Sequence, residues 1–111
     1  MKVISIKTFL LFYNKFTGII IANNQTIISF FKDGYLHRKN APAYYSLNEC
    51  VEWYENGKCH REDGPATEHE GGGKGWWFKY EFWGKNDAFT VESWKEKVKE
   101  LKRKEKLKIF L

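Results

Sequence analysis

The stretch of sequence that decides the fold occurs twice. It reads Phe31-Lys32-Asp33-Gly34-Tyr35-Leu36-His37-Arg38-Lys39-Asn40-Ala41-Pro42-Ala43 the first time and Tyr54-Glu55-Asn56-Gly57-Lys58-Cys59-His60-Arg61-Glu62-Asp63-Gly64-Pro65-Ala66 the second. An aromatic residue, a glycine, a His-Arg pair and a Pro-Ala pair return at the same spacing. Matched spacing marks a repeat, in which each copy is one small unit that stacks on its neighbours. The sequence therefore predicts stacked small β units.

Each copy carries a strong signal for a tight β-hairpin. Asp33-Gly34 and Asn56-Gly57 suit type I′ turns, because these turns need positive φ at both central residues. Apolar and aromatic residues precede both turns. Pro42 and Pro65 lack a backbone N–H, so we expect each at the start or edge of a strand. The two hairpins are therefore expected to be equivalent.

The shared pattern, aromatic-x-(Asp/Asn)-Gly-x-x-His-Arg-x-(Asp/Asn)-x-Pro-Ala, resembles the H-R-x-D-G-P-A repeats of small phage and bacterial proteins. Those repeats are themselves similar to MORN repeats. The resemblance covers residues 26–89, although the first copy has Asn40 in place of Asp63 and Ala41 in place of Gly64. We expect a third, degenerate copy to start at residues 82–85. The resemblance implies an antiparallel sheet of stacked hairpins and a phage or prophage origin, and it brings no enzymatic activity.

Further strands are expected around the two copies. Content of β-branched and aromatic residues predicts strands over 2–12, 18–22, 26–32, 43–47, 50–54 and 66–70. Residues 71–75 are rich in glycine and predict a solvated loop. Residues 76–83 form the clearest strand. Its period of two places one set of side chains in the core, namely Trp76, Phe78, Tyr80 and Phe82. The opposite face carries Trp77 and Trp83, which we expect to be either partly exposed or covered by the helix.

A helix is predicted after the last strand. Thr90 is a good N-cap, and the helix runs to about Lys106. An apolar stripe should pack on the sheet and consists of Val91, Trp94, Val98 and Leu101. The predicted fold is mainly β (α+β), a single domain over 1–111 built as an antiparallel β-meander of hairpin repeats with one C-terminal α-helix. Its parts are N-terminal strands in 1–25, repeats in 26–89 and the helix in 90–108.

Composition and charge narrow the class of protein. The 111 residues include 9 Phe, 6 Tyr and 5 Trp, which suits a thin sheet whose buried area comes from large rings. The net charge is +5, with basic residues concentrated at both ends and acidic residues in 48–70. Such asymmetry favours a charged partner. No segment approaches transmembrane length, and only two cysteines occur, so we expect a cytoplasmic protein with reduced thiols and no membrane contact.

The two His-Arg pairs allow two interpretations. In the first, His37 and His60 are general bases. Arg38 and Arg61 then hold a phosphate, and Asp63 orients an imidazole. In the second, Arg pairs with an acid such as Asp63, and His fills a turn and donates to the backbone. Active sites are usually single, whereas a turn device is reused in every unit, so the second interpretation is favoured. The residues assigned to the repeat are Gly34, His37, Arg38, Pro42, Gly57, His60, Arg61, Asp63, Gly64 and Pro65.

No motif predicts a cofactor or a metal. Cys50, Cys59, His60 and His69 lack the two close ligand pairs of usual zinc modules. We therefore expect a non-enzymatic binding module whose partner is a host protein or a ribonucleoprotein complex. The resemblance and the uneven charge together suggest a phage-encoded inhibitor of a host defence protein, such as a CRISPR effector, acting in the host cytoplasm.

Three groups of side chains are candidates for the contact surface. They are the aromatics Trp77 and Trp83, the acids Glu49, Glu52, Glu55 and Glu62, and the helix lysines Lys95, Lys99 and Lys102. An alternative function is a nucleic-acid-binding accessory protein that uses the basic helix. A third is a phosphodiester-cleaving enzyme that uses His60.

Overall fold

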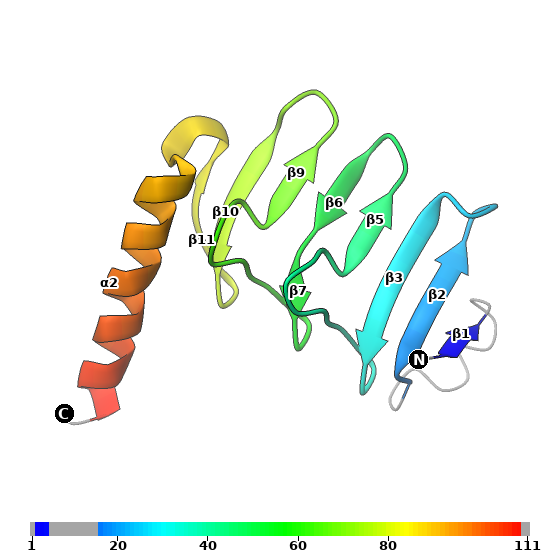
Figure 1. Ribbon diagram of the computed structural model, residues 1–111, viewed down its shortest axis with the longest axis horizontal. Helices are drawn as coiled ribbons and strands as arrows, with labels where there is room; N and C mark the ends of the chain where they lie inside the picture. Colours follow the sequence, from blue (N-terminus) through cyan, green and yellow to red (C-terminus); the bar gives the residue numbers. More distant parts are fainter. Residues whose placement is uncertain (1, 5–15, 110–111) are drawn as a thin grey trace.

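The computed structural model describes residues 2–4 and 16–109 and shows a mainly antiparallel sheet with one C-terminal helix (Figure 1). The larger sheet contains β1 (Lys2–Ile4), β2 (Gly18–Ala22), β3 (Ile27–Lys32), β4 (Tyr35–Leu36), β5 (Tyr44–Ser46), β6 (Cys50–Glu52), β9 (Thr67–His69), β10 (Lys74–Phe78) and β11 (Glu81–Lys85). A smaller sheet pairs β7 (Tyr54–Glu55) with β8 (Lys58–Cys59). The predicted fold class is thus confirmed.

The strands lie side by side in nearly sequential order, β1-β2-β3-β5-β6-β9-β10-β11, so the protein is one layer thick for most of its length (Figure 1). Its extents are 44 × 38 × 17 Å. β1 pairs with β2 in parallel, which corrects the expectation of an antiparallel sheet at this end. Most of the strand expected over 2–12 lies outside the described residues.

The two predicted hairpins are confirmed as equivalents. Asp33 and Gly34 have φ of 50° and 84°, and Asn56 and Gly57 have φ of 51° and 77°, so both turns have the left-handed backbone of type I′. The strands on either side pair as expected, β3 with β4 and β7 with β8. Consecutive copies join through matching backbone bonds. Gly57 N–H donates to the carbonyl of Leu36 at 2.8 Å, as Tyr80 N–H does to that of Cys59 at 3.1 Å.

The structure corrects the prediction for residues 76–83. They are two strands, β10 and β11, joined by a turn at Lys79-Tyr80, where φ is 48° and 76°. Tyr80 and Phe82 are therefore not core residues and are 67% and 52% exposed. This turn is evenly spaced from the other two, so the third copy starts before residues 82–85. The turn is imposed by docking onto the second copy, because neither residue favours positive φ by itself.

The core lies between the third hairpin and the helix α2 (Val91–Ile109). Thr90 caps this helix as predicted, its Oγ1 accepting from the backbone N–H of Ser93 at 3.1 Å. A short 3₁₀ helix, η1 (Asn86–Ala88), leads from β11 towards it. The buried cluster consists of Trp76, Phe78, Trp94, Val98 and Leu101. Val91 is 40% exposed, so its assignment to the apolar stripe is wrong.

Within the part of the chain that the structure describes, no helix is long and apolar enough to cross a membrane.

Candidate functional site

The two histidines join consecutive copies of the repeat. The backbone N–H of Asn56 donates to Nδ1 of His37 at 2.9 Å, and the backbone N–H of Lys79 donates to Nδ1 of His60 at 2.9 Å. Each imidazole thus binds the first turn residue of the next hairpin. The expectation that histidine donates to the backbone is wrong in direction, because the ring nitrogen accepts. Trp83 occupies the matching position in the last copy, and Lys97 Nζ lies 4.6 Å from the centre of its ring.

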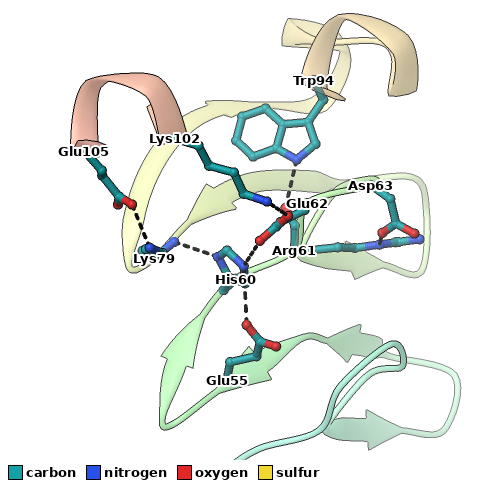
Figure 2. Close-up of polar contacts among 9 residues, drawn as sticks. All are labelled: Glu55, His60, Arg61, Glu62, Asp63, Lys79, Trp94, Lys102 and Glu105. Atoms are coloured by element: carbon teal, nitrogen blue, oxygen red, sulfur yellow. Dashed lines mark hydrogen bonds and ion pairs between the residues drawn. The ribbon is translucent and has the colours of Figure 1, made fainter. Parts of the chain in front are cut away.

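His60 is at the centre of the most connected polar cluster (Figure 2). Its side chain is 6% exposed. Because Nδ1 accepts from Lys79, the proton of the neutral ring lies on Nε2. Nε2 faces two carboxylates, Glu62 at 3.2 Å and Glu55 at 3.4 Å. Both ring nitrogens are therefore engaged within the protein.

The cluster also ties the helix to the sheet. Lys102 of α2 donates to Glu62, and Lys79 at the third turn donates to Glu105 of α2 at 2.8 Å (Figure 2). The indole N–H of Trp94 donates to the carbonyl of Arg61 at 2.8 Å. The contacts around His60 thus link the second copy, the third hairpin and the helix.

The pKa of Glu62 reflects its contacts with Lys102 and His60. Partial burial acts to raise its pKa, but the hydrogen bond and charge of Lys102, together with His60, hold the pKa of Glu62 below the usual 4.5. The ionised carboxylate is therefore favoured in the folded protein. A depressed pKa contributes stability above the unfolded pKa, and this contribution is lost as the pH falls through the folded value.

Lys102→Met tests this contribution. Both partners are about half exposed, so we expect the free energy of unfolding to fall by less than about 1 kcal/mol at pH 7. The difference between wild type and variant should shrink as the pH falls from 5 to 3, measured by urea unfolding at each pH. Lys95→Met on the same helix is the control and should show no such trend. A difference that persists unchanged at pH 3 would contradict the assignment.

The two arginines share a repeated set of contacts. The guanidinium carbon of Arg38 lies 4.0 Å from the centre of the Phe30 ring, and that of Arg61 lies 3.9 Å from the Trp53 ring. Nη1 of each donates to a proline carbonyl, Pro42 at 3.3 Å and Pro65 at 3.1 Å. Arg61 also pairs with Asp63 at 2.9 Å, as predicted. A Cβ at Gly64 would lie 2.8 Å from Cζ of Arg61, so glycine leaves room for this side chain.

The predicted contact residues do not converge on one surface. Glu55 and Glu62 meet at His60, whereas Glu52 accepts from the hydroxyl of Tyr54 and Glu49 accepts from that of Ser46. On the helix, Lys99 pairs with Glu96 and Lys102 with Glu62. Lys95 is exposed. Trp77 and Trp83 are half-buried, with Trp77 packed on Phe82 at 5.1 Å and Trp83 under Lys97.

Both cysteines are free thiols. Burial, with a smaller effect from the charge of Glu52, raises the pKa of Cys59 to about 12. Burial also raises the pKa of Cys50, again with help from nearby acids. Since the thiolate is the reactive form, both thiols are chemically quiet near neutral pH. No group of three or more His, Cys, Asp or Glu side chains in residues 2–4 and 16–109 is arranged to hold a metal ion.

Cys59 should therefore react very slowly in the native protein. In a Cys50→Ser variant we expect alkylation at pH 8 to be on the order of 100-fold slower than in urea, because burial suppresses both the thiolate and access to it. The rate is measured by mass spectrometry over time. The matched Cys59→Ser variant reports on the half-buried Cys50 and should react faster. Equal native rates for the two thiols would contradict the burial of Cys59.

An open groove lies on the larger sheet, on strands that do not carry the residues of the His60 cluster. It has a volume of about 510 Å³ and lies over β3, β5 and β6. Ile28, Tyr45, Val51 and Glu68 are opposite one another in the register of β3, β5, β6 and β9, so they share one face. We name it the β3–β6 groove. Its apolar lining is Ile28, Phe30, Tyr45, Leu47 and Val51, with Arg38 beside them.

The groove could not be predicted from the sequence, because the strand pattern alone does not indicate which apolar side chains stay uncovered. Leu47 is 63% exposed and Ile28, Tyr45 and Val51 are each partly exposed. A comparison of the two copies indicates part of the groove, because the apolar ring of Tyr45 stands where the next copy has Glu68. Comparisons with protein-family models, curated proteins and solved structures found no match for this chain.

Proposed function

We propose that the protein is a non-enzymatic protein-binding module. One observation carries the proposal: a row of apolar side chains lines an open groove of about 510 Å³ on a sheet that is one layer thick. Binding sites are typically concave and mostly apolar, with a few polar groups among the lining residues. Ile28, Tyr45 and Val51 share this face, and the exposed Leu47 lies beside them.

The His-Arg pairs support a structural role over a catalytic one. His60 is 6% exposed and has both ring nitrogens engaged, by Lys79 on one side and by carboxylates on the other. A general base needs a nitrogen within reach of a substrate proton. The same contact recurs at His37, which argues for a device of the repeat.

Within this class we assign the protein the role of a phage-encoded inhibitor of a host defence protein, such as a CRISPR effector. The resemblance to phage H-R-x-D-G-P-A repeats and the uneven charge support this role. The alternative, a nucleic-acid-binding accessory protein, is supported by the exposed lysines and arginine of α2. Lys95, Arg103 and Lys106 make no ion pair among the described residues.

The experiment separates these functions by their dependence on salt. We expect the tagged protein to retain one defined bacterial protein at about 300 mM salt, where exposed charges are strongly screened. That protein, identified by mass spectrometry, is then purified, and the pair should re-form and the partner should lose its activity. A variant with Lys95→Glu, Arg103→Glu and Lys106→Glu should still bind it.

Labelled single-stranded RNA and duplex DNA form the second arm of this test. Binding to phosphates releases counterions, so affinity falls steeply as salt rises. We expect only weak binding of either nucleic acid in fluorescence anisotropy. Tight, salt-sensitive binding that disappears in the charge variant would establish the accessory-protein alternative instead. Cleavage of either substrate that is abolished in a folded His60→Asn variant would refute the non-enzymatic assignment.

A further inference from the structure

The two arginines of the repeat differ in one respect. Arg61 has two carboxylates near it, Asp63 at 2.9 Å from Nε and Glu68 at 3.8 Å from Nη1. In the first copy Asn40 replaces the first acid and Tyr45 replaces the second. Arg38 keeps the stacking on Phe30 and the bond to Pro42, and its Nη1 donates to the hydroxyl of Tyr45 at 3.3 Å. Among the described residues it has no carboxylate partner.

Arg38 also lies at the edge of two hollows. It lines the β3–β6 groove and also a polar hollow of about 330 Å³, whose other lining residues are Asn40, Trp53, Glu55, His60, Arg61, Glu62 and Asp63. A partly buried guanidinium without an acid attracts a carboxylate strongly, because its planar donors match the two carboxylate oxygens. The second copy contains such a pair, because the carboxylate of Asp63 binds the guanidinium of Arg61.

We infer that the β3–β6 groove binds a segment of a partner protein in which an acidic side chain lies beside large apolar side chains. The carboxylate binds the guanidinium of Arg38, as Asp63 binds that of Arg61, and the apolar groups pack on Ile28, Tyr45 and Val51. This inference rests on the proposed protein-binding function and names the chemistry of its partner.

The surroundings favour a single carboxylate over a polyanion such as nucleic acid. Glu68 follows Val51 in the register of the same face, and Glu49 and Glu70 lie at the adjoining turns. These acids would repel a chain of phosphates. Beside Arg38 itself Tyr45 stands in the position that would otherwise carry an acid. The acids of the polar hollow, Glu55, Glu62 and Asp63, are already paired with His60, Lys102 and Arg61.

The probe is a capped pentapeptide with glutamate between leucine and phenylalanine, flanked by glycines. We expect it to shift the NMR signals of the Arg38 Nε–H and of the Ile28, Tyr45 and Val51 amides. A matched peptide with glutamine should bind about tenfold more weakly, as should one with alanine in place of both apolar residues. Shifts that map elsewhere, or equal affinity for the glutamate and glutamine peptides, would overturn the inference.

Asn40→Asp is the decisive variant. It puts a carboxylate of the chain itself two residues after Arg38, as Asp63 is two residues after Arg61. The backbone at residue 40 has a φ of 62°, which Asp tolerates, whereas Asp63 does not have a positive φ. We expect the melting temperature to stay equal or rise while peptide affinity falls at least about tenfold. Lys85→Gln, at an exposed position on β11, is the control and should bind as wild type does. Arg38→Gln should lose peptide binding too. If that variant does not fold, Asn40→Asp still tests the inference, because it leaves Arg38 in place.

The same variant separates this inference from the proposed function. If the protein partner captured from lysate binds Asn40→Asp as tightly as wild type, the groove assignment fails and protein binding stands. If the peptide binds at Arg38 and no protein partner is retained, the groove assignment stands and the proposed function fails. Self-association of the free protein that Asn40→Asp abolishes would identify the occupant as a second copy and overturn the inference of a different partner.

Discussion

Replacing Trp94 with alanine is expected to lower the free energy of unfolding by about 4 kcal/mol, the largest effect of any single substitution considered. Its side chain is fully buried and packs on Phe89 and Trp76, with ring centres at 4.9 and 5.7 Å. The change also leaves the carbonyl of Arg61 without the indole N–H. Because the helix is held to the sheet mainly by this cluster, the alanine variant should lose a large part of its total stability.

Urea unfolding followed by circular dichroism measures this effect. Trp94→Phe is the matched variant, because it keeps an aromatic ring in the cluster and removes the indole N–H. We expect it to cost about 1–2 kcal/mol. A loss below about 1 kcal/mol for the alanine variant would show that α2 does not depend on this contact.

His60→Ala should cost about 3 kcal/mol, the second largest effect. It removes a buried ring, leaves the backbone N–H of Lys79 without its acceptor and leaves Glu62 without the imidazole. His60→Asn should cost less, because the amide oxygen takes the place of Nδ1 as acceptor. The measurement is again the free energy of unfolding in urea.

The repeat supplies its own control for this prediction. His37→Ala removes the same backbone contact, from Asn56, in the first copy. His37 is only partly buried, so we expect a cost of about 1 kcal/mol. Equal losses at the two positions would contradict the importance of burial and of the carboxylates around His60.

The hairpins could be predicted because their turns carry their own conformational preference. Asp33-Gly34 and Asn56-Gly57 favour positive φ, and the structure places both turns there. Lys79-Tyr80 has no such preference. Its backbone is fixed by the second copy, through His60 Nδ1 and the carbonyl of Cys59. A period of two in the aromatic residues therefore predicted one long strand where docking produces a third hairpin.

The candidate site was harder to predict than the fold. The loss of an acid at Asn40 is visible in the sequence. Its consequence for Arg38 depends on the side chain at Tyr45 lying beside the guanidinium, as that of Glu68 lies beside Arg61, and the sequence alone does not show these contacts. The exposure of Phe82 and Tyr80 likewise depends on the absence of a fourth hairpin in the described chain.

The change from His60 to Trp83 has an evolutionary consequence. A histidine at this position presents an acceptor for the backbone N–H of another hairpin. Tryptophan can only donate, so the series of hairpins ends there, and its ring contacts Lys97 of the helix instead. A tandem duplication of codons 44–66 therefore adds a unit that carries both its own turn and its own acceptor. Such a gene would encode a longer sheet with unchanged ends, so the reach of this surface can grow in whole units without redesign of either terminus.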